Sequence, residues 1–524
     1  MAVNMESTIE KAQIMESTSI QVPDNLPETA LAEVKPIRGK FDRENVFNTL
    51  RNFYDEDQIK TMQERGVDSR MVFGINSYYM ALIKGDGMQN AAGVTVLPVM
   101  PPSQPLQHLV VPIVAEAADK SGEKDPSNQI RYSPGTLKGK ILHKYDEIVL
   151  GYTALACSAH CRYCYRLDLF NGSTGKGLVK AEELRDYVRN YNTSLKASNG
   201  LDPVTGEKRF PVTEVLLSGG DPMVLSNKQL YKYLAAAAEG GAHIVRIGTK
   251  EMAFRPMRFD ENMAEMLKIF HTNYPHIHVN IITHFTHPDE MLERDMDGNY
   301  KQENGYYVWL DAIAQAVKNM ASLDFVSMDN QTPIILHVNN NADTMHLLHE
   351  ELRRKGIKPK YIFQCREIEG HRAFAVPVEE AWRIHTTSQQ GLSDACRSRF
   401  AMSTEWGKLE VVSVIDGIPA QLLASLPEEI AGPIQSIFGK GLIVMKLHRS
   451  PHSADTQGDL VIARRNPEAL WLSDYEDRIV YDGRTPEKYG AMVAMLQALL
   501  PLDTIEQFAT IANGRSEKRL VAGA

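Results

Sequence analysis

Between residues 147 and 390 the chain alternates strand-like and helix-like segments six times, and this alternation restricts the fold more than any other feature. The six pairs are 147–154 with 180–191, 212–220 with 226–240, 243–249 with 260–273, 276–285 with 307–322, 324–331 with 341–356, and 358–365 with 377–390. Ser226 and Asp260 are placed as helix N-caps, and Gly240 as a stop signal. A repeated strand–helix pattern makes consecutive strands parallel, with the functional loops at the strand C-termini. Because a closed barrel needs eight units, six predict an α/β fold with a partial (β/α)6 barrel, open on one side.

The segments outside this repeat are expected to form extensions. Residues 1–40 are polar and contain three prolines, which predicts a mobile tail. Four regions are therefore predicted: the tail 1–40, a helical and loop region 41–140, the barrel 141–390, and a C-terminal region 391–524. For residues 416–524 an extra strand–helix module with an oligomer contact is the hypothesis.

Composition narrows the class of protein. The 524 residues are 43% hydrophobic and 23% charged, as in an ordinary globular enzyme, and the net charge is −9. An acidic chain without a basic tract argues against nucleic acid as a partner. We see no secretory signal and no run of about 18 apolar residues, so no membrane partner is expected. Five cysteines are too few for a secreted disulfide framework, and a cytoplasmic protein is predicted.

Three of the five cysteines are clustered directly after the first predicted strand. Cys157, Cys161 and Cys164 have the spacing C-x3-C-x2-C, whereas Cys365 and Cys396 lie far along the chain. A structural zinc site needs four ligands, and no second cysteine pair supplies them. Three thiolates suit a [4Fe-4S] cluster whose fourth iron stays open for another ligand. Zinc or another metal, and no metal at all, remain the alternatives.

With these residues the sequence resembles the radical S-adenosylmethionine (SAM) superfamily. In that superfamily the open iron binds SAM, and reduction yields a 5′-deoxyadenosyl radical. The resemblance implies that Tyr163, directly before the third cysteine, lies near the adenine. It also implies that Ser218, Gly219, Gly220 and Asp221, the "SGGD" after the second strand, contact the SAM amino group.

A closer resemblance, over about residues 74–415, is to the lysine 2,3-aminomutase family. Motifs in the family's order carry it: "INSYYMALI" (75–83), "HKYDEIVL" (143–150), "CRYCYR" (161–166), "VLLSGGDPMVLS" (215–226), "IVRIGT" (244–249), "THFTHPDE" (283–290), "DNQTPI" (329–334) and "PKYIFQC" (359–365). This resemblance implies an isomerase that uses SAM and pyridoxal 5′-phosphate (PLP) to move an α-amino group to the β-carbon. It further implies that Arg166 holds the substrate α-carboxylate and that His284 and Gln331 lie near SAM.

The same resemblance implies a PLP site. Tyr145 corresponds to a tyrosine near the PLP ring, and Lys144 stands where an arginine contacts the phosphate. Lys408, after Gly407, corresponds to the lysine that binds PLP, although the family's run of glycines is here reduced to one. Ile148 replaces a second phosphate-binding arginine, which weakens the predicted phosphate site.

The chain departs from the family where lysine is recognised. In the family, two aspartates bind the substrate ε-ammonium. This chain has Arg366 at the first position and Ala401 at the second. If the loop before Lys408 is shorter than in the family, Ser403 or Glu405 takes the second position. A guanidinium a few ångströms from an ammonium costs on the order of 4 kcal/mol. An acidic substrate such as glutamate is therefore predicted, unless Arg366 pairs with a neighbouring glutamate instead.

The sequence thus predicts a radical SAM, PLP-dependent amino-acid 2,3-aminomutase. Its expected partners are a small-molecule amino-acid substrate, an electron donor such as flavodoxin or ferredoxin, and further copies of itself in a homo-oligomer. Three alternatives stay open: a lysine 2,3-aminomutase, a radical SAM enzyme of this family with another reaction, and an iron–sulfur protein without catalysis. Cysteines that bind structural zinc in some family members are absent here.

Overall fold

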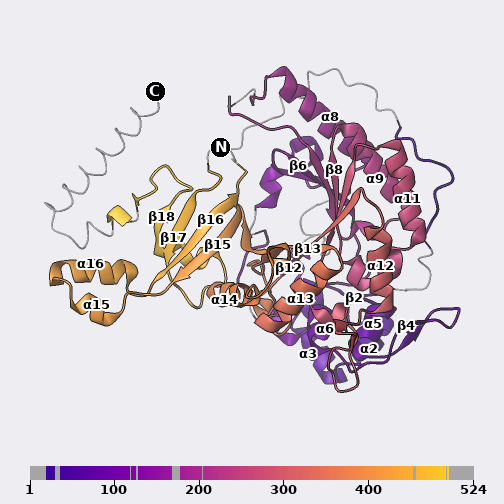
Figure 1. The fold of residues 1–524 in the computed structure, drawn as a ribbon, viewed down its shortest axis with the longest axis horizontal. Coiled ribbons are helices and arrows are strands. Elements are labelled where there is room, and N and C mark those ends of the chain that lie inside the picture. The colour runs from indigo at the N-terminus through magenta and orange to yellow at the C-terminus, as the bar shows by residue number, and fades with distance from the viewer. Residues whose placement is uncertain are drawn as a thin grey trace. The chain divides into compact units, whose positions relative to one another are not determined.

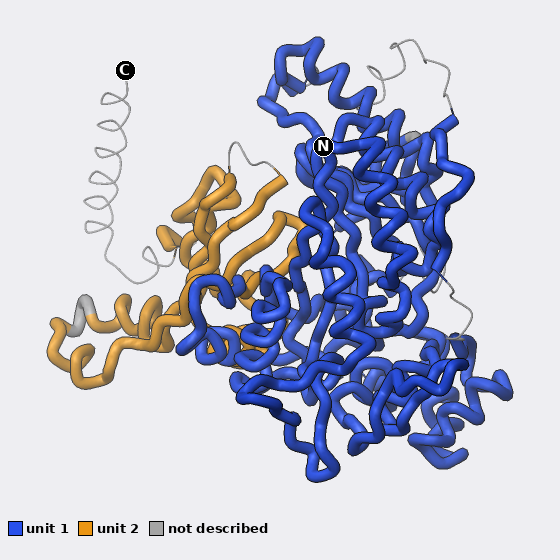
Figure 2. The backbone as a smooth tube through the Cα atoms, turned by 45° about the vertical axis from the view of Figure 1, so that its right-hand side comes forward, with its two compact units in different colours: residues 1–376, 384–399 blue, residues 377–383, 400–524 orange. Residues whose placement is uncertain are grey.

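The computed structural model describes residues 19–29, 36–118, 120–125, 128–167, 177–202, 205–451, 456–490 and 492–494. The chain divides into two compact units, which Figure 2 shows in different colours. The first unit comprises residues 1–376 and 384–399, and the second comprises residues 377–383 and 400–524. Parts of the predicted tail and of the C-terminal region lie outside the described residues, and the four predicted regions remain a prediction.

A sheet of six parallel strands forms the centre of the first unit. The strands are β6 (Ile148–Ala154), β7 (Glu214–Gly219), β8 (Ile244–Gly248), β9 (His278–Thr283), β12 (Val326–Pro333) and β13 (Ile357–Phe363). They lie side by side in chain order, and each pairs in parallel with the next. At one edge β5 (Ile141–Tyr145) runs antiparallel to β6. The predicted α/β fold with a large parallel sheet is confirmed.

Each of these six strands is followed in the chain by a long helix. The helices are α8 (Ala181–Ala197), α9 (Asn227–Gly240), α11 (Glu261–Asn273), α12 (Asp311–Ala321), α13 (Ala342–Arg354) and α14 (Val378–Ser388). Figure 1 shows α8, α9, α11 and α12 along one side of the strands, each helix packed beside the next. The apolar stripe of each helix is buried, for example at Val188, Leu234 and Leu267.

The predicted helix caps are present with one difference. The Ser226 side chain accepts a hydrogen bond from the Gln229 amide at 3.2 Å, and Asp260 accepts one from the Met263 amide at 2.8 Å. The stop signal is displaced by one residue, because α9 continues through Gly240 and ends at Gly241. Gly241 has φ +101°, the left-handed conformation that glycine adopts readily after a helix.

The region before β5 supplies short helices and strands to the first unit. They are β1 (Pro36–Gly39), α2 (Glu44–Leu50), α3 (Glu56–Glu64), α4 (Val67–Arg70), β2 (Phe73–Asn76), α5 (Ser77–Lys84), β3 (Met88–Gln89), β4 (Thr95–Leu97), α6 (Gln104–Val110), and the 3-10 turns η1 (Val114–Ala117), η2 (Gln129–Tyr132) and η3 (Gly135–Leu137). All four residues of β2 are buried, and β1 pairs with β2 in antiparallel fashion. No helix within the described ranges combines the length and the apolar character needed to cross a membrane.

The second unit is built on antiparallel pairing. Its strands are β14 (Arg399–Thr404), β15 (Gly407–Ile415), β16 (Leu442–Arg449), β17 (Leu460–Arg464) and β18 (Ile479–Asp482), and each pairs antiparallel with the next. The helices α15 (Ala420–Ala424) and α16 (Glu428–Phe438) lie in the chain between β15 and β16. This region therefore contains a small antiparallel sheet, and Lys408 lies on its strand β15.

Candidate active site

Most predicted site residues of the first unit follow the carboxyl ends of the parallel strands. These are Cys157, Cys161, Tyr163, Cys164 and Arg166 after β6; Ser218, Gly219, Gly220 and Asp221 at the end of β7; His284 after β9; Gln331 near the end of β12; and Arg366 after β13. In a parallel sheet these ends lie on the same edge, where such folds carry their chemistry. Lys144 and Tyr145 lie on β5, and Lys408 lies on β15 of the second unit.

Contacts with the preceding region and with the segment after β8 hold the cysteine loop. The His160 amide donates to the Gly74 carbonyl at 2.8 Å, and the Ser158 amide donates to Glu251 Oε1 at 2.8 Å. A Cβ on Gly74 would lie 2.6 Å from the His160 ring, so only glycine allows this contact. These contacts hold the loop at Ser158 and at His160.

The three thiols are close enough to affect one another. Burial raises the pKa of Cys157 well above its ordinary value, and Asp221 and the other two thiols raise it further. Burial also raises the pKa of Cys161 to about 12. No three His, Cys, Asp or Glu side chains converge as a metal-binding group within the described ranges. The donor set nevertheless fits iron–sulfur chemistry, since one loop presents three thiols as the soft ligands that such clusters use.

A buried ion-pair network anchors the loop between the second and third cysteines. Arg162 is fully buried and binds Glu116 with Nη2 to Oε2 at 2.6 Å and Nε to Oε1 at 3.0 Å. Arg70 binds the same carboxylate at 2.6 Å, and its Nη2 donates to the Arg162 carbonyl at 3.2 Å. The sequence analysis did not predict this network, because 46 residues separate Glu116 from each arginine.

We expect Glu116→Gln to lower the free energy of unfolding by about 3–5 kcal/mol. The substitution leaves two buried guanidinium groups without their carboxylate, and breaking a buried ion pair from one side has that typical cost. Urea unfolding of the purified protein measures it. Glu56→Gln is the matched control, because its pair with Arg51 is exposed and such pairs contribute at most about 1 kcal/mol. Equal stability of the two variants would show that the network does not stabilise the loop.

The glycines of the loop after β7 allow a close approach to the cysteine loop. Gly219 has φ +121°, and a Cβ there would lie 2.3 Å from the Ala154 carbonyl oxygen. A Cβ on Gly220 would lie 2.4 Å from the Ala156 carbonyl oxygen. In this structure the neighbouring backbone occupies the space that the missing side chains leave, so the two loops pack directly on each other.

Asp221 joins this loop to the one after β8. Its buried carboxylate accepts hydrogen bonds from the Lys250 amide at 2.7 Å and from Thr249 Oγ1 at 3.0 Å. Burial raises the pKa of Asp221 to about 7, and the neighbouring Glu251 carboxylate adds to the rise. Asp221 therefore orders the strand ends in addition to the ligand contact that the sequence predicts for it.

Tyr163 and His284, both predicted to lie near SAM, contact each other. Tyr163 Oη lies 3.0 Å from His284 Nε2, and the two rings stack with their centroids 5.9 Å apart. Burial lowers the pKa of His284 well below its ordinary value, and the charge of Lys250 lowers it further. Burial and the charge of Lys250 therefore both disfavour the protonated imidazole.

Gln331 lies near the end of β12, the strand that pairs with β9. Asn330 on β12 lies opposite Thr283 on β9. Gln331 and His284 are the next residues of these two neighbouring segments. The buried Gln331 Nε2 has no hydrogen-bond partner in the part of the chain that the structure describes. Because buried polar groups are normally paired, this amide fits an acceptor on a bound molecule.

Two predicted substrate arginines meet at one tyrosine ring. The guanidinium carbons of Arg166 and Arg366 lie 4.8 and 4.6 Å from the centroid of the Tyr165 ring. Arg166 is buried and donates to the Gly219 carbonyl at 2.9 Å. Burial lowers the pKa of Arg366, and the charge of Arg166 lowers it further, while Tyr165 opposes both. Two guanidinium groups therefore lie beside one ring, and the Asp125 carboxylate is close enough to raise the pKa of Arg366.

The predicted PLP residues of the first unit lie on the edge strand. Tyr145 pairs with Ile148 and lies within electrostatic reach of the Arg366 guanidinium. Lys144 Nζ lies 5.2 Å from the centroid of the Tyr132 ring, and the Arg131 guanidinium carbon lies 5.9 Å from the same centroid. Arg131 is a second cation near Lys144 that sequence analysis missed, since no motif includes it.

Lys408 follows a tight hairpin in the second unit. Thr404 pairs with Gly407 across a turn of two residues, and Ser403 lies opposite Lys408. Gly407 has φ +121°, and a Cβ there would lie 2.0 Å from the Arg449 carbonyl oxygen. The single remaining glycine is therefore required by the hairpin, and it fixes the backbone directly before Lys408.

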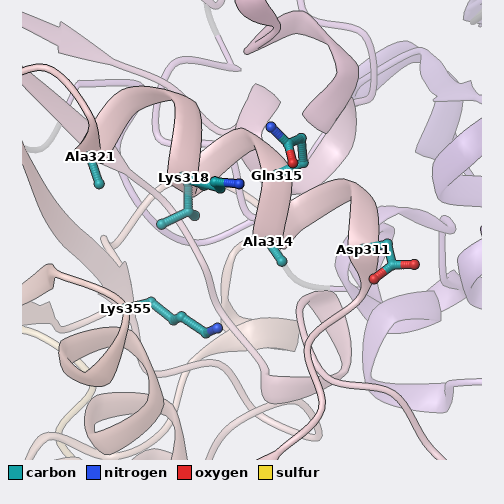
Figure 3. A pocket seen from close by; sticks show the side chains of 7 residues that line it. Asp311, Ala314, Gln315, Lys318, Ala321 and Lys355 are labelled. Atoms are coloured by element: carbon teal, nitrogen blue, oxygen red, sulfur yellow. The ribbon is translucent and has the colours of Figure 1, made fainter.

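A surface hollow of about 450 Å³ lies along α12 and is lined by seven residues, among them Lys318 and Lys355 (Figure 3). None of the predicted cofactor or substrate residues lines it. We therefore assign it no part in the candidate site.

Comparison with known proteins supports the resemblance predicted from the motifs. A candidate L-lysine 2,3-aminomutase of Aquifex aeolicus is 27% identical over 417 residues, covering 79% of this chain and 90% of that protein. The L-lysine 2,3-aminomutase of Bacillus subtilis is 27% identical over 64% of this chain and 61% of its own. The glutamate 2,3-aminomutase of Clostridioides difficile is 23% identical over 61% of this chain and 62% of its own. No family model matches the chain.

Among solved structures, a radical SAM methyltransferase from Sphaerobacter thermophilus aligns with a TM-score of 0.30 and 11% identity, over 50% of this chain and 68% of that one. This similarity is too low for an argument about the fold. The sequence matches carry the conclusion, because they run through most of the chain and share the aminomutase name. This chain is therefore a homologue of the lysine and glutamate 2,3-aminomutases, consistent with the lysine 2,3-aminomutase family.

Proposed function

We propose that this protein is a radical SAM, PLP-dependent amino-acid 2,3-aminomutase with a partial (β/α)6 barrel, and that its substrate is an acidic amino acid, glutamate in the first place. The observation that carries the proposal is the meeting of Arg166 and Arg366 at Tyr165, close to the loop of three cysteines. We further propose a cytoplasmic location, a homo-oligomer, and flavodoxin or ferredoxin as electron donor.

The residues of the site have separate tasks under this proposal. Cys157, Cys161 and Cys164 hold a [4Fe-4S] cluster, while Tyr163 and Gln331 contact SAM. Once bound, the cluster and SAM supply a radical that abstracts hydrogen, and PLP carries the amino group between neighbouring carbons. The protein orients these groups and excludes water, because a reactive radical must not meet solvent.

The charge of the site favours a substrate with two carboxylates. Both guanidinium groups are within cation–π distance of one ring, so they are separated by no more than the sum of those two distances. At an effective dielectric constant of 20, two like charges at that upper bound repel by about 2 kcal/mol. A dicarboxylate relieves that repulsion and pairs with each guanidinium, whereas the ε-ammonium of lysine would add to it.

The principal alternative is a lysine 2,3-aminomutase. It is favoured by the names of the relatives, most of which refer to lysine. An acidic side chain would then have to bind the ε-ammonium, and Glu405, in the hairpin directly before Lys408, is the candidate.

A substrate panel distinguishes the two. The protein is reconstituted without oxygen with iron, sulfide, SAM, dithionite and PLP, and is incubated with glutamate, aspartate or lysine. Mass spectrometry with authentic standards identifies β-amino isomers. We expect β-glutamate. Formation of β-lysine without β-glutamate would refute the acidic substrate, and the absence of every β-isomer would refute the aminomutase activity.

We expect Lys408 to be the lysine that binds PLP covalently. Borohydride reduction of the PLP-loaded protein, followed by peptide mapping, should find the PLP adduct on Lys408. The Lys408→Ala variant should lose at least about 90% of the adduct. Lys446→Ala, on the neighbouring strand β16, is the control and should keep wild-type labelling. An adduct on another lysine would show that the hairpin is aligned wrongly with the family's glycine loop.

A further inference from the structure

The loop that carries Arg366 is folded back on itself by hydrogen bonds. In this recognition loop, residues 364–371 after β13, the Ile368 amide donates to the Arg366 carbonyl at 2.9 Å, and the His371 amide donates to the Ile368 carbonyl at 2.8 Å. The His371 ring adds a bond from Nδ1 to the Arg366 carbonyl at 3.3 Å. Two bonds therefore end on the Arg366 carbonyl, so the place of that residue depends on how the whole loop is held.

Arg70, the last residue of α4, holds the far end of the recognition loop. Its Nε donates to the Glu369 carbonyl at 3.2 Å, although 299 positions separate the two residues. Gly370 follows with φ +78°, and a Cβ there would collide with Arg70 Nε. The glycine therefore leaves the space in which the guanidinium lies against the backbone of the loop.

The same guanidinium also holds the cysteine loop. Arg70 Nη1 and Nη2 donate to the Arg162 carbonyl at 3.3 and 3.2 Å, and Nη1 donates to Glu116 Oε2 at 2.6 Å. Arg162 directly follows Cys161 in the chain. The Arg70 side chain is only 9% exposed, so water competes little for these bonds. Because the donors of a guanidinium have fixed directions, Arg70 sets the position of the two loops relative to each other.

Apolar packing joins the same segments at a second place. Ile368 of the recognition loop forms a buried cluster with Met71 and Leu167, and Cys164 packs against this cluster. Met71 is the residue after Arg70, and Leu167 follows Arg166. The polar and the apolar contacts therefore connect the end of α4, the cysteine loop and the recognition loop.

We infer that Arg70 is a positioning residue for substrate recognition, which ties the recognition loop to the cysteine loop and thereby sets the place from which Arg366 meets the side-chain carboxylate of the substrate. The inference rests on the proposed function. Arg70 acts through Arg366 and not by touching the substrate. A displacement of a substrate-binding group by about 1 Å can cost on the order of 100-fold in rate, so the hold on the loop matters for the reaction.

The test uses Arg70→Lys in the full chain, reconstituted anaerobically with iron, sulfide, SAM, dithionite and PLP. Lysine keeps a cation beside Glu116, but it has a methylene group where arginine has Nε, so the Glu369 carbonyl loses its donor. We expect KM for glutamate to rise at least about tenfold while kcat stays within about threefold, the pattern of weakened substrate binding. Arg51→Lys is the matched control and should keep the wild-type KM, because the Arg51 side chain is exposed.

A double-variant cycle shows whether Arg70 acts through Arg366. In the Arg366→Asp background, Arg70→Lys should change KM for glutamate by less than about twofold, because the guanidinium that it positions is gone. Hydrogen exchange followed by mass spectrometry supplies a readout that needs no substrate. The peptide with the Ile368 and His371 amides should exchange at least about tenfold faster in Arg70→Lys than in the wild type, since the loop has lost an anchor.

The outcomes separate this inference from the proposed function. Wild-type KM or wild-type exchange in Arg70→Lys would overturn the inference, and so would an equal rise of KM in the wild-type and Arg366→Asp backgrounds. Loss of iron from Arg70→Lys would also overturn it, because Arg70 would then serve the cysteine loop and not substrate recognition. A wild-type protein that forms no β-glutamate would instead contradict the proposed function, and hydrogen exchange would still decide whether Arg70 holds the recognition loop.

Discussion

Replacing Cys161 by alanine is expected to abolish formation of 5′-deoxyadenosine from SAM. A [4Fe-4S] cluster with one open iron needs a thiolate on each of its other three irons. The loss of one thiolate therefore removes the cluster or its reactive geometry. Replacing a residue that merely supports a metal ligand typically costs 10–100-fold. For the ligand itself we expect a loss of more than about 100-fold. Anaerobic assay with SAM and dithionite measures the product by liquid chromatography.

A matched cysteine control is available in Cys396. It lies outside the cluster motif, on the 3-10 turn η8 (Asp394–Cys396), and Cys396→Ala should retain the wild-type rate and iron content. Cys157→Ala and Cys164→Ala should behave like Cys161→Ala. An alanine variant of the motif that cleaves SAM at the wild-type rate would disprove the assignment of the three cysteines.

The second large effect is expected at Arg366. Arg366→Asp should raise KM for glutamate at least about 30-fold, since loss of one partner of a buried charge pair costs roughly 2–5 kcal/mol. The structure supports this direction because the guanidinium lies against Tyr165 beside Arg166. Steady-state kinetics of wild type and variant, with glutamate and lysine as substrates, gives the ratio.

Two further variants isolate the contribution of the charge. Arg366→Lys keeps a cation at the site and should weaken glutamate less than Arg366→Asp does. Arg353→Asp changes the net charge equally on an exposed turn of α13 and should leave KM unchanged. If Arg366→Asp leaves KM for glutamate unaltered, the guanidinium does not recognise the substrate side chain.

The parallel sheet could be predicted because its pattern is local. Each strand is a short apolar run next to an amphipathic helix, and the chain order fixes which strands are neighbours. The antiparallel sheet of the second unit lacks such a rule. Its hairpin turns at Glu405 and Trp406, without the Asn-Gly or Asp-Gly pair that announces most two-residue turns. The helices α15 and α16 further separate β15 from its partner β16.

In the candidate site, too, some residues could be predicted from the sequence and others only from the structure. The cysteines and the "SGGD" loop are motifs of neighbouring residues, so the sequence shows them directly. Lys250 and Glu290 are 40 positions apart, and only the fold brings them into an ion pair. Gly219 illustrates a third case, since it belongs to a motif that the sequence shows, but only the structure gives the reason for a glycine there, the approach of the Ala154 backbone.

The most direct test of the central claim is SAM cleavage by the wild-type protein. The chain is reconstituted anaerobically with iron and sulfide, dithionite is added, and 5′-deoxyadenosine is quantified with and without glutamate and PLP. The account predicts an iron content of about four per chain and 5′-deoxyadenosine that requires dithionite and increases with glutamate and PLP. A reconstituted protein that holds no cluster, or that holds one but forms no 5′-deoxyadenosine under any of these conditions, would contradict it.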